Sequence, residues 1–464
     1  MPASTTLGRS LRFAARHTCN PPKHGLRWSR RQLSQLRPLP LVPLVAADAA
    51  DQPLAPTCPP LVRTFLAAND GAKHRAYRHF WSTDRRDLTS PIRYYESSAA
   101  IPRVTDRTWL RDACTCEECV DPSSGQKRFA STDVPTKLKI TTFNVTAEGN
   151  LQVCFHNDFL TGRPHVSVYP PTFWRQHLQR ETTTPGPKLW DRKVISEVSP
   201  YFSYESFMAD GLEYRQAMTA LSEYGLIFLR HVPESEEIIK DIALKLGVIQ
   251  HTFYGTTWDV RSKPDAENVA YTNSYLGLHQ DLLYMRHAPR IQILHCLQNT
   301  CEGGESLFSD GFRASHEFRC KFPELVQPLR ERRVTYHYNK GGNNYRWSRE
   351  VLQNGPGVFW SPPFQKPEQP DSLTERGVRI FLQWHEAACQ LKPLFESENN
   401  VYEYKMLPGE CVIFDNCRVL HGRRAFNTSS GERLLKGTYV ENDSYASTLK
   451  SLNLVPKSES TLGD

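Results

Sequence analysis

The sequence predicts a mainly β protein with flanking helices, whose longer domain is a jelly-roll double sheet. Short apolar runs of strand length recur from residue 225 onward, and few segments between them have helical periodicity. An upstream segment around residues 137–155 also alternates as strands do. With 464 residues, 39% of them hydrophobic and 23% charged, the chain has the composition of a globular protein with two to three domains.

The first 47 residues contain no acidic residue, because the first acid is Asp48. Arginines recur here among Leu, Ala, Phe, Trp and Ser, a composition typical of mitochondrial targeting segments. A basic tail without targeting function, in a cytoplasmic protein, is the alternative. Much of the net charge of +7 lies in this segment, so a nucleic-acid partner is disfavoured, and no apolar run is long enough to span a membrane.

A small β domain is expected next, with strands at Lys137–Phe143 and Leu151–Phe155 separated by the turn-like Glu148–Asn150. A Thr/Pro-rich stretch, Thr182–Pro187, marks its end. The expected organisation is a targeting or disordered segment at 1–47, a linker at 48–84, the N-terminal domain at 85–180, a linker at 181–200, the larger domain at 201–452 and a tail at 453–464.

The larger domain begins with helical periodicity and continues mainly as strands. Ile238, Ile239, Ile242 and Leu246 lie on one face of a predicted amphipathic helix. Helices are expected at Glu213–Glu223, Ser235–Leu246 and Gly311–Lys321. Strands are expected at Gly225–Leu229, Ile291–Cys296, Ser306–Phe308, Val378–Phe381, Cys411–Phe414 and Leu434–Val440.

Two histidines and one aspartate have the pattern of a metal site. His279 and Asp281 are two residues apart, so in a strand their side chains point to the same side. Alone this pair is common at strand ends and in turns, but His421 follows it far downstream. Two imidazoles and one carboxylate on one face of a metal form the facial triad of non-haem Fe(II) oxygenases. We therefore predict a catalytic Fe(II) site at these three residues.

Arg433 adds a second signal, because it lies 12 residues after His421 (433 − 421), enough for one strand to end and the next to return. A buried guanidinium there could bind the distal carboxylate of a dicarboxylate cosubstrate through two hydrogen bonds. The alternative is a surface arginine in a basic run with Arg423 and Arg424. Together with the triad, Arg433 indicates a 2-oxoglutarate pocket beside the iron.

Three of the 12 cysteines, Cys114, Cys116 and Cys119, lie within six residues of each other. A tetrahedral structural zinc needs four ligands, usually Cys or His, so a fourth must come from elsewhere in this domain. His165, His156 and Cys154 are the candidates. Three unrelated reduced cysteines, or an iron–sulfur site, are the alternatives, but an iron–sulfur site usually needs four cysteines.

Aromatic residues are frequent close to the triad in sequence. Tyr254, Trp258 and Tyr271 precede it, and Tyr439 follows Arg433. If these four side chains converge, they could form a cage for a trimethylammonium group, which has no N–H donor and binds well to aromatic faces. Core packing is the alternative explanation.

Together these residues resemble the gamma-butyrobetaine dioxygenase family, within the wider taurine-dioxygenase-like superfamily. The resemblance extends from Trp109 to Tyr445. It rests on the ordered motifs Trp-Leu-Arg-Asp-x-Cys-x-Cys-x2-Cys, Tyr-Gly-x-Thr-Trp, Asn-Val-Ala-Tyr, His-x-Asp, Leu-His-Cys, Gly-Gly and Asp-Asn-x-Arg-x-Leu-His-Gly-Arg-Arg. It implies a double-stranded β-helix catalytic domain, a small zinc-binding N-terminal domain and a homodimer. It also implies a small-molecule substrate, Fe(II), 2-oxoglutarate, O2, ascorbate and structural zinc.

Transferred position by position, the resemblance implies a role for each matching residue. Iron falls on His279, Asp281 and His421, and the 2-oxoglutarate carboxylate on Arg433. Zinc falls on Cys114, Cys116, Cys119 and His165, because the segment from His165 to Tyr169 matches the family's histidine segment better than the one at His156. The ammonium cage falls on Tyr254, Trp258, Tyr271 and Tyr439, and a carboxylate-binding asparagine on Asn268.

The chain departs from the family at Gln383-Trp384, where a second carboxylate-side asparagine is expected. Trp384 would reshape that end of the pocket. The resemblance implies hydroxylation of a trimethylammonium carboxylate, with gamma-butyrobetaine, the precursor of L-carnitine, preferred. Trimethyllysine 3-hydroxylation, or another small-molecule substrate for the same fold, is the alternative. A non-catalytic jelly-roll binding protein is the competing class, and the complete triad with Arg433 argues against it.

Overall fold

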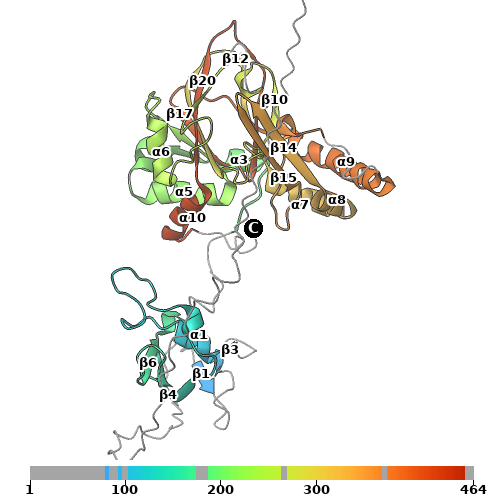
Figure 1. Ribbon diagram of the computed structural model, residues 1–464. Helices are drawn as coiled ribbons and strands as arrows, with labels where there is room; N and C mark the ends of the chain where they lie inside the picture. Colours follow the sequence, from blue (N-terminus) through green and yellow to red (C-terminus); the bar gives the residue numbers. More distant parts are fainter. Residues whose placement is uncertain are drawn as a thin grey trace, which may run out of the picture. The chain divides into compact units, whose positions relative to one another are not determined.

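The computed structural model describes residues 79–82, 92–96, 103–173, 186–262, 269–367 and 374–454 (Figure 1). The targeting segment expected at 1–47, most of the first expected linker, Asn268 and residues 455–464 lie outside these ranges. No helix of the described residues is long and apolar enough to cross a membrane. The bounds of the two domains expected from the sequence, 85–180 and 201–452, stay predictions.

The N-terminal part contains two three-stranded sheets, ordered β1-β2-β3 and β4-β5-β6. Strand β1 lies within residues 48–84, so that segment is not a linker throughout. The two strands expected around Glu148–Asn150 are confirmed as β4 and β5. The elements are β1 (His79–Ser82), β2 (Ile92–Glu96), β3 (Arg103–Thr105), α1 (Arg107–Asp112), η2 (Ser131–Asp133), β4 (Lys139–Val145), β5 (Leu151–His156) and β6 (His165–Tyr169).

Alternation along β5 places Leu151, Val153 and Phe155 on one face, where all three are fully buried. A buried ion pair adds to this core. The guanidinium of Arg111 binds both carboxylate oxygens of Asp158, and neither side chain is exposed. Burial raises the pKa of Asp158, but hydrogen bonds and charge from Arg111 outweigh it and the pKa is lowered.

Two sheets form the centre of the C-terminal part, one of six strands in the order β7-β8-β17-β11-β20-β9 and one of four in the order β10-β18-β13-β16. Their inner faces pack together, since Phe308 of β13 contacts Phe228 of β8 and Phe414 of β17 with ring centroids 5.9 and 5.7 Å apart. This double sheet agrees with the predicted jelly roll.

The strands of this part begin and end close to the predicted positions where the apolar runs are long. They are β7 (Tyr201–Ser203), β8 (Leu226–Arg230), β9 (Trp258–Val260), β10 (Leu276–His279), β11 (Ile291–Asn299), β12 (Glu302–Gly303), β13 (Ser306–Asp310), β14 (Arg333–Lys340), β15 (Asn343–Glu350), β16 (Tyr402–Tyr404), β17 (Glu410–Asp415), β18 (Val419–Arg423), β19 (Phe426–Asn427) and β20 (Arg433–Val440).

Helices cover the outer face of the six-stranded sheet and extend from the other end of this part (Figure 1). Ile239 and Ile242 of α6 pack with Ile291 and Ile293 of β11 in one buried cluster. The helices are α3 (Arg192–Val198), α4 (Tyr204–Met208), α5 (Leu212–Tyr224), α6 (Ile238–Leu246), η3 (Val269–Tyr271), α7 (Gly311–Lys321), η4 (Pro323–Leu325), α8 (Val326–Glu331), η5 (Pro362–Phe364), α9 (Glu375–Glu396) and α10 (Asn442–Ser451).

Two expectations are wrong. Val378–Phe381 is not a strand but the first part of α9, a 22-residue helix whose N-cap is the Thr374 side chain. The expected linker at 181–200 contains α3 and the fully buried Trp190, whose indole donates to the backbone carbonyl of Tyr224 at 2.7 Å. A buried tryptophan with a satisfied N–H is part of a core, not of a linker.

Candidate metal centre and cavity

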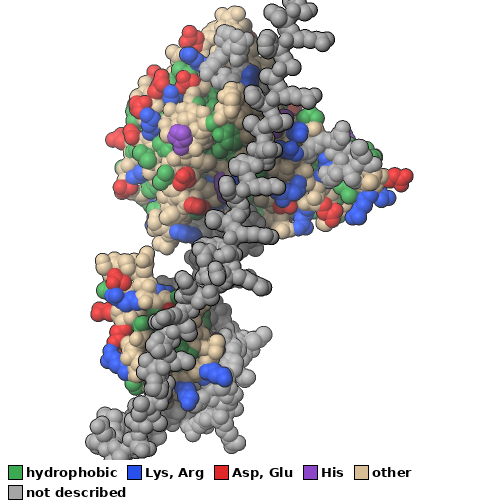
Figure 2. Space-filling model, in the orientation of Figure 1, with side chains coloured by type: hydrophobic (Ala, Val, Ile, Leu, Met, Phe, Trp, Pro, Cys, Tyr) green, Lys and Arg blue, Asp and Glu red, His purple; other side chains and the backbone are tan. Residues whose placement is uncertain are grey.

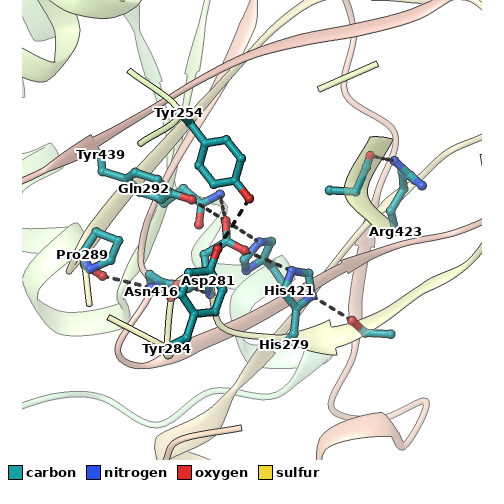
Figure 3. Close-up of polar contacts among 12 residues, drawn as sticks. Tyr254, His279, Asp281, Tyr284, Pro289, Gln292, Asn416, His421, Arg423 and Tyr439 are labelled. Carbon is teal, nitrogen blue, oxygen red and sulfur yellow. Dashed lines mark hydrogen bonds and ion pairs between the residues drawn. The ribbon is translucent and has the colours of Figure 1, made fainter. Parts of the chain in front are cut away.

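The three predicted iron ligands meet between β10 and β18. His279 is the last residue of β10 and lies directly opposite His421 of β18 in the antiparallel register, with ring centroids 4.4 Å apart. Asp281 follows two residues later and turns its carboxylate back towards both rings (Figure 3). The Asp281 carboxylate lies 3.2 Å from His279 Nε2 and 3.8 Å from His421 Nε2. These donor atoms all lie within 4.8 Å of one another, which fits a single ion.

Each of the two histidines offers a ring nitrogen that could bind a metal. Nδ1 of His279 is 2.9 Å from the carbonyl oxygen of Gly277, which fixes the ring and leaves Nε2 for a ligand. Burial, and then the nearby His279, lower the pKa of His421 to about 3, although the charge of Asp281 opposes this. A neutral imidazole is the form that coordinates metals.

Asp281 is held by backbone and side-chain contacts. The amide of Asn416 accepts from Asp281 N at 2.7 Å and donates to Asp281 O at 3.1 Å, so it fixes the backbone on both sides. Gln292 and Tyr439 donate to the carboxylate oxygen Oδ2 at 2.8 and 2.7 Å. Burial raises the pKa of Asp281, but the hydrogen bonds to its carboxylate, among them the one from Tyr439, outweigh burial and keep the pKa well below its usual range.

The turn after the ligands has a strained backbone. Leu282 has φ of +56°, a region that non-glycine residues rarely adopt. The preceding Gln280 fixes the turn, since its backbone N–H and its side-chain oxygen each bond to the backbone of Trp360 at 2.9 Å. Strain held in place by surrounding contacts is typical of functional sites.

Arg433 begins β20 and is 6% exposed, so the alternative of a surface arginine is wrong. Its Nε donates to the carbonyl of Gly304 at 3.3 Å, and burial lowers its pKa to about 10. Gly304 has φ of +75°, and a Cβ there would lie 3.1 Å from Arg433 Cδ, so the site needs glycine at this position. Within the described residues Arg433 forms no ion pair with an acidic side chain.

The neighbouring basic residues have different roles. Arg423 is buried and donates to three backbone carbonyls, those of Ala270 at 3.0 Å, Thr272 at 2.7 Å and Ser274 at 3.0 Å. Arg424 instead forms an exposed ion pair with Glu403 at 2.8 Å. Arg423 therefore anchors the segment that contains Tyr271 to β18, while Arg424 belongs to the surface.

The four predicted cage aromatics line the same cavity as the triad and Arg433. Tyr254 lies 6.4 Å from both Trp258 and Tyr271 between ring centroids, and the indole of Trp258 stacks on Tyr439 at 4.1 Å. Gly437 makes room for this stacking, since a Cβ there would lie 2.5 Å from the indole. Tyr439 thus joins the aromatic wall to Asp281, the predicted metal ligand.

Sequence reasoning missed three residues of the site. Gln292, a polar residue in the largely apolar run of β11, could have been noticed from the sequence. Asn416 is the asparagine of the quoted Asp-Asn-x-Arg motif, but its bonds to Asp281 depend on the tertiary fold. Tyr284 lines the cavity with its hydroxyl 3.5 Å from that of Tyr254, and burial raises its pKa.

The expectation for Gln383-Trp384 is not met. Trp384 is 7% exposed and packs in the core beside Phe381, while Gln383 lies on the exposed side of α9. Neither lines the cavity, so Trp384 does not reshape it. Asn268, the proposed carboxylate ligand, lies outside the described residues.

The predicted zinc ligands also come together. The donor atoms of Cys114, Cys116, Cys119 and His165 lie within 4.8 Å of one another, while His156 is exposed and outside the group. Burial raises the pKa of the Cys114 thiol, although hydrogen bonds from Ser167 and the backbone oppose this. Three sulfurs and one imidazole nitrogen are a donor set that fits tetrahedral zinc.

Comparison with known proteins defines the class of this chain. Residues 187–439 match the model of the family described as "Taurine catabolism dioxygenase TauD, TfdA family". The matched segment contains the metal triad, Arg433 and the cage aromatics. The chain belongs to this family, and it is a 2-oxoglutarate-dependent dioxygenase.

Individual relatives extend the similarity beyond that segment. "Dioxygenase str8" of Strobilurus tenacellus is 36% identical over 361 residues, covering 72% of this chain and 82% of the relative. A "Gamma-butyrobetaine dioxygenase" of Pseudomonas sp. (strain AK-1) is 29% identical, covering 74% and 88%. A "Trimethyllysine dioxygenase, mitochondrial" of Mus musculus is 25% identical, covering 75% and 83%. The predicted family resemblance is confirmed.

Proposed function

We propose that this enzyme hydroxylates an unactivated C–H bond of a small trimethylammonium carboxylate, and that gamma-butyrobetaine, converted to L-carnitine, is the preferred substrate. In this reaction one oxygen atom of O2 enters the substrate as a hydroxyl, and the other enters succinate as 2-oxoglutarate loses CO2. The observation that carries the proposal is the shared cavity, which is lined by the three metal ligands, a buried arginine and four aromatic rings.

Each group in the cavity has a distinct task in this proposal. His279, Asp281 and His421 would hold Fe(II), which supplies O2 activation and the decarboxylation of 2-oxoglutarate when bound. Arg433, a buried cation without an acidic partner in the described part of the chain, would bind the distal carboxylate of 2-oxoglutarate. Tyr254 would orient the substrate's cationic end together with the other aromatic residues of the wall.

Further parts of the proposal rest on the N-terminal third. The cluster of Cys114, Cys116, Cys119 and His165 would bind a structural zinc. The acid-free, Arg-rich residues 1–47 support import into mitochondria. Asn268 as a carboxylate ligand, stimulation by ascorbate and a homodimer follow from the family resemblance.

Two other substrates are alternatives within the same chemistry. Trimethyllysine shares the cationic group, and mitochondrial relatives that carry its name are 24–25% identical. A different small molecule is favoured by one specific observation, the higher identity to the protein named "Dioxygenase str8", 36% against 29% for the bacterial butyrobetaine enzyme.

The test is succinate formation by anaerobically iron-loaded protein, supplied with 2-oxoglutarate, O2 and ascorbate, with each candidate substrate or none. We expect gamma-butyrobetaine to stimulate turnover and to give L-carnitine in equal amount with succinate. Stimulation by trimethyllysine alone would reassign the substrate. The variant His279→Ala should form no succinate above background while remaining folded, and undiminished activity would contradict the site.

A further inference from the structure

Gln292 is a polar side chain within an apolar strand. It lies in β11, is 2% exposed, and lines the cavity between the two sheets. Its neighbours Ile291 and Ile293 pack in the helix-covered core on the other side of the sheet. Alternation along the strand therefore turns Gln292 to the inner face, towards the metal centre.

Gln292 and Tyr439 act on the same atom. They are directly opposite each other on β11 and β20, and cross-strand neighbours point to the same face of a sheet. The Gln292 amide donates to Asp281 Oδ2 at 2.8 Å, and the Tyr439 hydroxyl donates to it at 2.7 Å (Figure 3). A carboxylate oxygen has about two lone-pair directions. Both are filled on Oδ2, so Oδ1 is the oxygen left for a further ligand.

The other end of the Gln292 amide is unsatisfied. Its Oε1 is buried and has no hydrogen-bond partner within the described residues. The amide cannot be reversed to relieve this, because an ionised carboxylate only accepts hydrogen bonds and Oε1 cannot donate to Asp281. The side chain thus leaves its own acceptor unpaired while its NH2 group bonds to the metal carboxylate. Buried polar atoms are nearly always paired, and exceptions concentrate at functional sites.

We propose that Gln292 is a positioning residue for the metal carboxylate. With Tyr439 it keeps Oδ2 of Asp281 in hydrogen bonds to the protein, so that the carboxylate presents Oδ1 to the metal in one rotamer. The proposal rests on the proposed function, because it takes Asp281 as a metal ligand. Loss of such an outer partner typically weakens metal binding by about 10- to 100-fold.

The test is anaerobic calorimetric titration of the metal-free protein with Mn2+. We expect Gln292→Met, which keeps the length of the side chain and removes its donor, to bind Mn2+ about 10- to 100-fold more weakly than wild type. The matched control is Gln298→Met, the same substitution at an exposed position of the same strand, with unchanged affinity. Tyr439→Phe keeps the ring and should show a loss of the same order.

The double variant and the metal-free melting temperature sharpen the test. Because both donors hold one oxygen, the double variant should lose less affinity than the product of the two single losses. A purely structural Gln292 would lower the melting temperature of the metal-free variant but leave Mn2+ affinity unchanged, and that result would overturn the proposal. If Gln292→Met does not fold, the Mn2+ affinity of Tyr439→Phe is compared with that of the wild type instead. If the wild type binds no Mn2+, the metal site itself fails, and the proposed function with it.

Discussion

Arg433 carries a positive charge in a buried position. It is 6% exposed, and within the described ranges no acidic side chain pairs with it. Since a charge-assisted hydrogen-bonded pair contributes roughly 1.5–3 kcal/mol, we expect Arg433→Gln to raise the KM for 2-oxoglutarate about 10- to 150-fold. Succinate formation at varied 2-oxoglutarate concentration measures it.

The control for this change is Arg424→Gln, which removes an exposed guanidinium paired with Glu403. This exposed ion pair contributes little to stability and lies away from the cavity. The KM of Arg424→Gln for 2-oxoglutarate should therefore equal that of the wild type. Equal KM values for wild type and Arg433→Gln would rule out Arg433 as the carboxylate-binding residue.

Single residues also explain how much of the site could be predicted. His279 and Asp281 follow from strand alternation, which is a local rule, and His421 follows from the chemistry that needs a second imidazole. Asn416 could not be found in this way, because its two bonds to Asp281 bridge 135 residues. Such a contact depends on how β10 and the turn before β18 meet, which no local pattern encodes.

At the scale of elements, Arg418 and Asp310 form a buried link. Arg418 donates to both carboxylate oxygens of Asp310, at 3.0 and 2.9 Å, and to the backbone carbonyls of Glu223 and Lys188. Asp310 also accepts from Phe312 N at the start of α7. The pair thereby connects β18, α7 and the end of α5.

We expect Arg418→Met to lower the free energy of unfolding by about 3–5 kcal/mol, because it leaves the Asp310 charge buried and unpaired. Urea denaturation measures this change. Arg424→Met is the matched control and should change stability by less than about 1 kcal/mol. A loss as small as the control's would show that water or a rearranged neighbour satisfies Asp310.

The element that sequence reasoning misassigned is α9. The run Val378–Phe381 has three apolar residues out of four, which favoured a strand, but Val378 is 42% exposed. The buried positions of the helix, Ala387, Leu391 and Phe395, repeat every four residues, so the longer window indicates a helix. By contrast, α7 begins and ends where predicted, because Asp310 caps its first turn.

The cysteine cluster gives a prediction for the N-terminal part. Structural zinc contributes directly to folding, so Cys116→Ser should lower both the bound zinc and the melting temperature of this part. Cys320→Ser, at an exposed cysteine on α7, is the control and should change neither. Elemental analysis and thermal scanning measure both quantities. Unchanged zinc content in Cys116→Ser would exclude this cluster as the zinc site.

At the scale of the whole molecule, the double sheet could be predicted from the sequence. The helices that pack against it could be predicted only in part. Strands β8, β11 and β17 are rich in apolar residues because most of their residues are buried on both faces, and such runs are visible in sequence. The hairpin of β14 and β15 was not predicted, since its second strand alternates exposed and half-buried residues without an apolar pattern. On the face shown in Figure 2, acidic and basic side chains are interspersed.

The stability of the whole fold should depend on pH through His295. This residue of β11 is fully buried, and neither ring nitrogen has a hydrogen-bond partner in the part of the chain that the structure describes. Burial lowers its pKa from 6.5 to about 4. At pH 7.5 the ring is neutral in both the folded and the unfolded state, so the group makes no difference there. As the pH falls below 6.5, the His295 ring is protonated in the unfolded state. In the folded state it stays neutral until about pH 4.

Stability is therefore lost between these two pH values, by up to roughly 3 kcal/mol from this group. We expect His295→Leu to lose less free energy of unfolding than the wild type when urea denaturation is moved from pH 7.5 to pH 4.5. His316→Leu, at an exposed histidine on α7, should follow the wild type. His421, a predicted metal ligand, has a pKa lowered to about 3 and lowers stability in acid in the same way, so the measurement must be the difference between variants. Identical pH dependence in His295→Leu and wild type would mean that water reaches the ring and that His295 is not the acid-sensitive group.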